Sequence, residues 1–142
     1  MIRAEVVLLL FLTAVLWGVT PVLEKVGLGR TDPLTGVTIR SVAVTAALLL
    51  YLFFAGKLGA VFQAGPKTII IFSVTGIVAG LFGMITYFTA LKKGATSQIV
   101  PIAATYPLIT AFLSVLILGE RVTPLRVIGT ALIVLGIWFV KG

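Results

Sequence analysis

Residues 6–28 read VVLLLFLTAVLWGVTPVLEKVGL, an apolar run in which the charged pair Glu24 and Lys25 stands near the far end. The hydrocarbon core of a bilayer is about 30 Å thick, and about 20 helical residues cross it. Arg3 and the leucines after it look like the start of a signal peptide. The run continues well past that length, however, and no small-residue cleavage site closes it. It therefore predicts a retained transmembrane helix.

Four more apolar runs follow the first, and each has about the length of a membrane span. They cover residues 34–55, 68–91, 97–118 and 124–140. Three of the four connections are only a few residues long, so consecutive helices are expected to be antiparallel neighbours. Because the runs are continuous rather than alternating, a β-barrel is excluded. The sequence predicts an all-α integral membrane protein with five transmembrane helices, in a single domain that spans residues 1–142.

The ends of the runs carry signals for helix boundaries. Thr123 is expected to cap the last helix, and either Thr96 or Ser97 is expected to cap the fourth. The lysine pair that begins at Lys92 is expected to place cations on the last carbonyls of the third helix. The longest connection, residues 56–67, has apolar side chains between two lysines, which fits a short segment on the membrane interface or a plain loop.

The composition agrees with a lipid environment. Hydrophobic residues make up 60% of the chain and charged residues only 11%, with a mean hydropathy of +1.24. A soluble domain carries about a quarter charged residues. The net charge of +7 would be typical of nucleic-acid binding in a soluble protein. Here the cations stand at the ends of apolar runs, where they contact lipid headgroups, so we expect a bilayer and no nucleic acid as partner.

The inventory of reactive side chains is small. The chain has no cysteine, no histidine and only four acidic residues. Histidine and cysteine are the commonest metal ligands and supply most nucleophiles and general bases. We therefore expect neither an enzyme active site nor a metal or other cofactor.

Prolines interrupt two of the predicted helices. Pro21 lies within the first run, and Pro101 and Pro107 lie within the fourth. A proline inside a helix frees a backbone carbonyl and bends the chain. Freed carbonyls at membrane depth are tolerated where protein or a water-filled cavity satisfies them. One such proline is more simply a packed kink, but three in so short a chain favour the lining of a cavity.

Charged residues also fall inside the apolar runs. Glu24 and Lys25 lie near the end of the first, and Arg40 lies within the second. Long side chains in such places snorkel to the interface. Alternatively they form a polar site that faces a cavity. For Lys25 we favour snorkelling, whereas for Glu24 and Arg40 both alternatives stay open. Glu24 is the carboxylate best placed to carry protons.

Small residues recur at helical spacing in two of the runs. Gly76 and Gly80 are four residues apart in the third run, and Gly129 and Gly136 are seven apart in the fifth. Small residues on one face let another backbone approach closely, although this pattern also arises by chance in glycine-rich membrane sequences. We take Gly129 and Gly136 as candidates for a dimer interface.

Several short motifs occur together in a familiar order. They are LWG at residues 16–18 with Lys25, DPL at 32–34 followed by Arg40, YFTAL at 87–91, Pro107, GERVTP at 119–124 and GTALIVLG at 129–136. With these motifs the chain resembles a single EamA-type repeat of the drug/metabolite transporter superfamily over nearly its whole length. It also looks like a longer relative of the four-helix small multidrug resistance proteins.

The resemblance implies a fold and a function. Typical members have ten helices in two inverted repeats of five, around a pathway lined by the first four helices of each repeat. They move small metabolites, amino acids or drugs. This chain has one repeat, so it would be one half of such an inverted-repeat (5+5) transporter. The small multidrug resistance proteins dimerise through glycines seven apart and use a glutamate in the middle of their first helix, whereas Glu24 stands near the end of the helix.

An unfused repeat with an odd number of helices recovers inverted symmetry only if two copies insert in opposite orientations. Lysine and arginine near helix ends set orientation. One side of the predicted topology carries Arg3, Lys57, Lys67, Arg121 and Arg126. The other side carries Lys25, Arg30, Arg40, Lys92, Lys93 and Lys141. This near balance favours dual topology.

The sequence therefore predicts a multi-pass protein of the cell (inner or plasma) membrane that transports a small solute by alternating access, as an antiparallel homodimer. One alternative is a proton-coupled exporter of cationic compounds that uses Glu24. Another is a non-transporting assembly or lipid-binding subunit. The candidates for the substrate cavity are polar, charged or aromatic residues: Trp17, Thr20, Glu24, Arg40, Tyr87, Gln98, Thr105 and Tyr106.

Overall fold

The computed structural model describes residues 3–121 and 123–140, which are helices and their connections without any strand. Val122, within the GERVTP motif, and Lys141, within the charge balance, lie outside the described residues. The chain forms two compact units, Met1–Lys92 and Lys93–Gly142. Each unit is described by itself.

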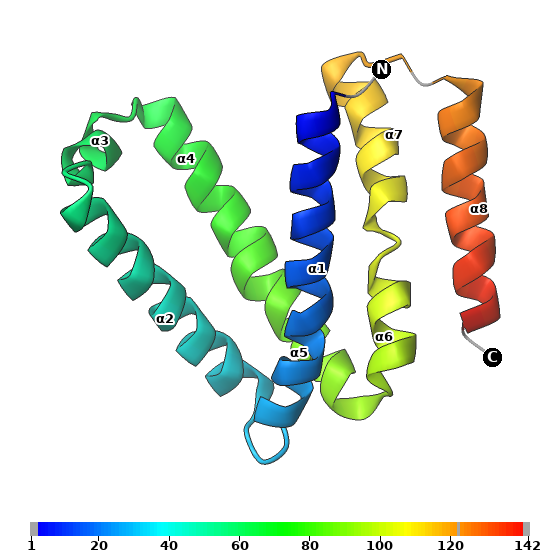
Figure 1. The fold of residues 1–142 in the computed structure, drawn as a ribbon, viewed down its shortest axis with the longest axis horizontal. Helices are drawn as coiled ribbons and strands as arrows, with labels where there is room; N and C mark the ends of the chain where they lie inside the picture. Colours follow the sequence, from blue (N-terminus) through cyan, green and yellow to red (C-terminus); the bar gives the residue numbers. More distant parts are fainter. Residues whose placement is uncertain (1–2, 122, 141–142) are drawn as a thin grey trace. The chain divides into compact units, whose positions relative to one another are not determined.

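The first unit contains three long helical segments joined by short connections (Figure 1). Its elements in chain order are α1 (Ala4–Gly27), α2 (Pro33–Phe54), α3 (Leu58–Gln63), α4 (Pro66–Thr75), η1 (Gly76–Gly83) and α5 (Met84–Lys93). The last three follow one another without a gap, as one helical segment, Pro66–Lys93. These segments confirm the first three predicted helices, with ends displaced by one or two residues.

The ends of α2 show why it starts and stops where it does. Asp32 accepts a hydrogen bond from the Thr35 N–H at 3.0 Å, and Pro33 occupies the first turn. This arrangement satisfies one of the unpaired N–H groups of the first turn. At the other end, Gly56 has a φ of 64°, and the Lys57 N–H donates to the Leu52 carbonyl at 2.9 Å. The 56–67 connection then forms α3, so it contains a helix rather than a plain loop; its position at a membrane interface stays a prediction.

The glycine-rich segment Gly76–Gly83 is a π-helix, η1, inserted between α4 and α5. The sequence predicted an uninterrupted helix here, and the helix is continuous but widened. Glycine is a poor α-helix former, by about 1 kcal/mol relative to alanine, so a run with three glycines loses little when it departs from α geometry. A Cβ at Gly76 or Gly80 would meet no atom within 4 Å, so their spacing makes no close helix contact within the described chain.

The buried core of the first unit lies at one end, where α1, the α1–α2 turn, α2 and α5 meet. Its members are Leu28, Val37, Phe88 and Leu91, each at most 3% exposed. Gly36 permits this contact, because a Cβ there would lie 3.2 Å from both the Leu28 and the Phe88 side chains. Elsewhere along these helices the large apolar side chains are exposed, as expected for surfaces that face lipid or another helix.

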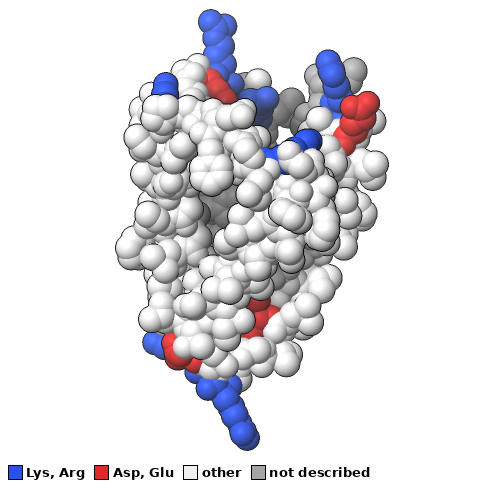
Figure 2. All heavy atoms as spheres, turned by 90° about the vertical axis from the view of Figure 1, so that its left-hand side faces the viewer, with Lys and Arg blue, Asp and Glu red and all other residues white. Residues whose placement is uncertain are grey.

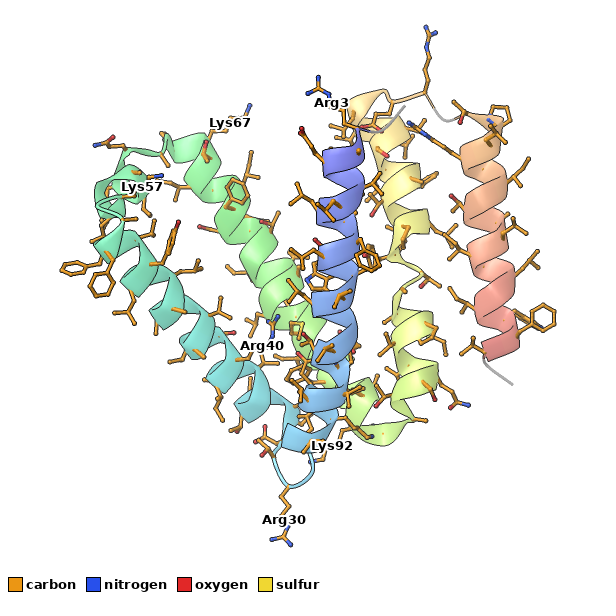
Figure 3. The ribbon with its side chains drawn as sticks, in the orientation of Figure 1. Arg3, Arg30, Arg40, Lys57, Lys67 and Lys92 are labelled. Atoms are coloured by element: carbon orange, nitrogen blue, oxygen red, sulfur yellow. The ribbon has the colours of Figure 1, made fainter. Side chains whose placement is uncertain are left out.

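Apart from the Glu24 and Arg40 side chains, the charged side chains of the first unit lie toward its two ends (Figure 3). Figure 3 places Arg3, Lys57 and Lys67 at one end, and Arg30 and Lys92 at the other. The face that α2 and α3 present in Figure 2 likewise has its charges toward the two ends. Antiparallel spans place successive connections at opposite ends of the unit. The cations that flank the first three predicted spans are therefore expected at both ends.

The second unit contains α6 (Thr96–Ala103), α7 (Tyr106–Leu118) and α8 (Pro124–Val140), and α8 contacts α6. Gly119, with a φ of 65°, ends α7. The Thr123 hydroxyl accepts from the Arg126 N–H at 3.4 Å, which confirms the predicted cap of the last helix. The predicted cap of α6 was wrong: Ala95 holds that position and no side chain caps the helix.

Four helical segments of the described chain are long and apolar enough to cross a membrane. They are Ala4–Gly27, Pro33–Phe54, Pro66–Lys93 and Thr96–Leu118. The helix Pro124–Val140 is apolar but has only 17 residues. At 1.5 Å per residue it is about 25 Å long, which is at the lower limit for a span. The length and composition of these segments indicate a multi-pass membrane protein, and the fifth span stays a prediction.

Candidate functional site

A pocket of about 350 Å³ opens in the first unit, among α1, the α1–α2 turn, α2 and α5. Volumes of this size hold small ligands. Most of its lining is apolar or glycine, with two hydroxyls and two charged groups. The lining residues are Thr20, Leu23, Glu24, Gly27, Leu28, Thr31, Gly36, Ile39, Arg40 and Phe88.

Helical spacing brings these residues together. Thr20, Glu24, Gly27 and Thr31 are separated by four, three and four positions, so they follow one face of α1 into the turn. Gly36 precedes Arg40 by four residues on α2. Glycines in both helices leave room between the backbones, and the tight contact at Gly36 closes one end of the space.

The two charged groups of the pocket form an ion pair. The Arg40 Nε atom lies 3.5 Å from the Glu24 Oε1 atom. Figure 3 shows Arg40 extending from α2 toward α1. A guanidinium cannot lose its proton in a protein, and a charge within the hydrocarbon region requires a partner. The pairing thus explains how both charges are accommodated within apolar helices. It also brings together Glu24 and Arg40, which the sequence predicted as two separate candidates.

Lys25 takes a different role from its neighbour Glu24. Its ammonium nitrogen donates to the carbonyl oxygens of Leu91 and Lys92, at the end of α5, at 2.5 and 3.2 Å. Snorkelling of Lys25 to the membrane interface stays a prediction, and the structure adds these two carbonyl partners. Lys92 donates to the Thr31 carbonyl at 2.8 Å, so the expected cation on the last carbonyls of this helix comes from α1 instead. The hydrogen bonds of these two lysines connect α1 and the α1–α2 turn to α5.

Of the remaining candidates of the first unit, Thr20 belongs to the lining, whereas Trp17 and Tyr87 do not. The Thr20 hydroxyl lines the pocket and donates to the Leu16 carbonyl at 2.7 Å. Trp17 is 65% exposed and does not line it. Tyr87 precedes the lining residue Phe88, and their ring centroids are 6.1 Å apart. Pro21 is buried, and α1 continues through it without a break.

In the second unit, a break between Ala103 and Tyr106 divides the fourth predicted helix into α6 and α7. Pro101 lies inside α6 and Pro107 lies in the first turn of α7. The Thr105 hydroxyl, at the break, donates to the Ile102 carbonyl at 2.8 Å. Broken helices at membrane depth often line binding sites.

Four other candidates of the second unit are on exposed surface. Gln98 is exposed on α6, and Tyr106 is 55% exposed at the start of α7. A Cβ at Gly129 or at Gly136 would meet no atom within 4 Å. Both glycines of the candidate dimer interface therefore have space for larger side chains.

Sequence reasoning missed several lining residues, among them Thr31, Gly36, Ile39 and Phe88. A signal for two of them was present. Thr31 continues the spacing of Thr20 and Glu24, and Gly36 stands one turn before Arg40. Phe88 carried no such signal, because its place in the pocket depends on how α5 packs against α1.

The chain was compared with known proteins. The model of a family described as "EamA-like transporter family" matches residues 5–142. An uncharacterised protein of Methanocaldococcus jannaschii is 27% identical over 131 residues, which cover 92% of each chain. A protein of a Sinorhizobium species, described as an uncharacterised transporter in the cobO 3′ region, is 25% identical over 125 residues and 88% of each chain. No solved structure matches.

Proposed function

The chain belongs to the EamA-like transporter family, and on this basis we propose that it carries a small solute across the cell membrane by alternating access, as an antiparallel homodimer. The observation that carries the proposal is the pocket of about 350 Å³ among α1, α2 and α5, with its Glu24–Arg40 ion pair. Polar and ionisable groups are expensive within a membrane, and they commonly mark substrate or ion pathways.

The proposal of a homodimer is supported by the size of the curated relatives. Both curated relatives are matched over almost their whole length, so they too have the size of one repeat. Inverted symmetry places a substrate site near the bilayer midplane, between two repeats of opposite orientation. The near balance of lysine and arginine between the two sides permits a single sequence to insert both ways. Two copies of this chain supply both halves.

Alternating access would use the helical irregularities of the chain. The π-helix Gly76–Gly83 and the break between α6 and α7 lack regular α-helical geometry. Such segments bend at lower cost than regular helix. We propose that they permit the two protomers to exchange conformations around a shared cavity. Trp17 and Tyr87 of the first unit, and Gln98, Thr105 and Tyr106 of the second unit, remain candidate substrate-cavity residues within their own units.

Reconstitution tests the proposal. Proteoliposomes that contain the purified full chain should take up or release solutes from a mixed metabolite pool faster than empty liposomes do. A double variant, Arg40→Ala with Glu24→Ala, removes both members of the ion pair and should abolish the difference, whereas Gln63→Ala, at an exposed position of α3, should preserve it. Solute movement that never exceeds that of empty liposomes would favour a non-transporting assembly or lipid-binding subunit.

A second candidate function is proton-coupled export of cationic compounds. The observation that favours it is that Glu24, a carboxylate within a membrane-spanning helix, lines the pocket. In that case Glu24→Gln should abolish transport driven by a pH gradient while substrate binding persists. Undiminished pH-driven transport by this variant would leave facilitated diffusion, or coupling to another ion, as the better account.

A further inference from the structure

The two members of the Glu24–Arg40 ion pair differ in their accessibility. The Arg40 side chain is 44% exposed, whereas the Glu24 side chain is only 12% exposed. The guanidinium is therefore the more accessible member of the pair. The ion pair involves the Nε atom of Arg40, so the two terminal nitrogens can face a ligand. A guanidinium presents its N–H donors in a planar fork that fits oxyanions with two parallel hydrogen bonds.

The charged groups around the pocket are mostly positive, which also favours an anionic ligand. Lys25 binds a backbone carbonyl at the end of α5, Lys92 binds one in the α1–α2 turn, and Arg30 lies in the same turn. Among the described residues of this end, Asp32 is the acidic residue besides Glu24, and its side chain caps α2. Cations thus outnumber carboxylates around the site, and their summed field favours an anion over a cation.

The remaining lining residues indicate what the uncharged part of a ligand would contact. Leu23, Ile39 and Leu28 give the pocket apolar walls, and Thr20 and Thr31 add oxygen atoms at two positions. A small apolar body can replace lipid or water against these walls. Arg40 already has one carboxylate beside it, so each negative charge on a ligand is only partly compensated in this apolar space, and a dianion is less favourable than a monoanion.

We propose that the pocket binds a small organic monoanion, whose oxyanion group pairs with the terminal nitrogens of Arg40 while its apolar body lies against Leu23 and Ile39. Glu24 positions the guanidinium and partly competes with the ligand for it. The inference rests on the proposed transport function, and it names the substrate class for that site. It differs from the cation-exporting alternative, in which the less accessible Glu24 would be the binding group.

Three probes with one ring and different charges test the inference: benzenesulfonate, benzenesulfonamide and phenyltrimethylammonium. The first and third keep their charge at any working pH, so they cannot cross a membrane as neutral acid or base. Binding is measured by calorimetry on the full chain in lipid nanodiscs. Benzenesulfonate should bind, and the neutral and cationic probes should bind at least about tenfold more weakly.

Variants identify the groups responsible. Arg40→Gln should weaken benzenesulfonate binding about tenfold or more, because the charged donor is lost. Glu24→Gln should retain or strengthen it, because the competing carboxylate is removed. Lys67→Gln, a charge change at the other end of the unit, should have no effect. Helix content from circular dichroism verifies that each variant is folded, and Glu24→Gln provides the test if Arg40→Gln does not fold.

Failure of this inference is distinguishable from failure of the transport function. Preferential binding of phenyltrimethylammonium, lost in Glu24→Gln, would overturn the anion site while transport could still be measured with that cation. Equal binding of the three probes, or binding that ignores Arg40, would also overturn it. Conversely, Arg40-dependent binding of benzenesulfonate without its uptake into proteoliposomes would uphold the anion site and contradict the proposed transport.

Discussion

The ammonium nitrogen of Lys25 lies 2.5 Å from the carbonyl oxygen of Leu91, which joins the last turn of α1 to the end of α5. Unpaired carbonyls at a helix C-terminus carry partial negative charge and are stabilised by cations. The cation here comes from a helix more than sixty positions earlier in the chain. The Lys92 side chain donates a hydrogen bond to the Thr31 carbonyl in the α1–α2 turn. The two lysines therefore hold this end of the first unit together beside the buried core.

Replacement of Lys25 should therefore destabilise the fold. Lys25→Met keeps the length and the apolar stem of the side chain but leaves the α5 carbonyls without their donor. We expect a loss of about 2 kcal/mol, since hydrogen bonds to charged groups contribute about 1.5–3 kcal/mol. Thermal unfolding in detergent measures it. Lys67→Met, in the first turn of α4, serves as the control, and equal shifts for the two variants would contradict the capping role.

Substitution of Gly36 by a residue with a larger side chain should lower the stability of the fold. Gly36→Ala places a Cβ at 3.2 Å from the Leu28 and Phe88 side chains. Overpacking of this kind costs about 1–3 kcal/mol. Gly27→Ala is a matched control in the same pocket, because a Cβ there meets nothing within 4 Å. We expect thermal stability to fall for Gly36→Ala and not for Gly27→Ala; the reverse order would mean that α1, α2 and α5 do not meet as described.

Much of the fold could be predicted from the sequence, because the apolar runs have membrane length and their ends carry proline, glycine and capping signals. The limits of α8, Pro124–Val140, were predicted to the residue. The π-helix at Gly76–Gly83 was not predicted. The weak α-helix propensity of glycine indicates where a segment can depart from α geometry, but it does not indicate which geometry the segment adopts. The cap on α5 was missed because Lys25 reaches it through packing between helices that are distant in sequence.

Acid should weaken the start of α2. Hydrogen bonds from the side chain and the backbone N–H of Thr35 hold the pKa of Asp32 below its ordinary value of 3.8. A carboxyl group with a lowered pKa stabilises the folded state above its unfolded pKa, and this contribution is lost as the pH falls through the folded pKa. Asp32→Asn can still cap but does not titrate. Below about pH 4 the melting temperature should therefore fall more steeply for the wild type than for Asp32→Asn. Parallel curves would show that Asp32 does not contribute.

The candidate dimer interface can be tested without disturbing the protomer. A Cβ at Gly129 or Gly136 meets no atom of the described chain within 4 Å, so a side chain can start at both positions without a clash at its first atom. If two copies of α8 pack through these glycines, the double leucine variant should shift detergent-solubilised protein from dimer toward monomer. Light scattering measures the mass. Gly76→Leu with Gly80→Leu is the comparison, since those glycines are equally open, and a shift confined to that pair would move the interface to η1.

The candidate site was predictable only in part, for a physical reason. Glu24 and Arg40 stand out in a sequence because charges are rare within apolar runs, and Thr20 was noted beside a helix breaker. Their pairing across two helices, and the participation of Phe88, depend on the packing of α5 against α1 at Gly36. Trp17 was noted for its chemical type alone, and the structure places it outside the pocket lining.

The account depends most on insertion of the same chain in both orientations, because one repeat of opposite orientation must complete each pathway. In the first unit, three cations mark one end and Arg30 and Lys92 mark the other, so neither end has a strong orientation signal (Figure 3). Two lysines added to one end should bias insertion and lower transport. Coexpression of two variants biased in opposite directions should then restore it.

The most direct measurement labels a single cysteine with a membrane-impermeant reagent in intact cells. The chain has no cysteine of its own, and Gln63→Cys places one on an exposed position of α3, in the connection between two spans. We expect only part of the population to react before the membrane is opened and the remainder to react afterwards. If all molecules react from one side, the antiparallel homodimer is wrong, and the chain must work with an oppositely inserted partner of another sequence or as a parallel assembly.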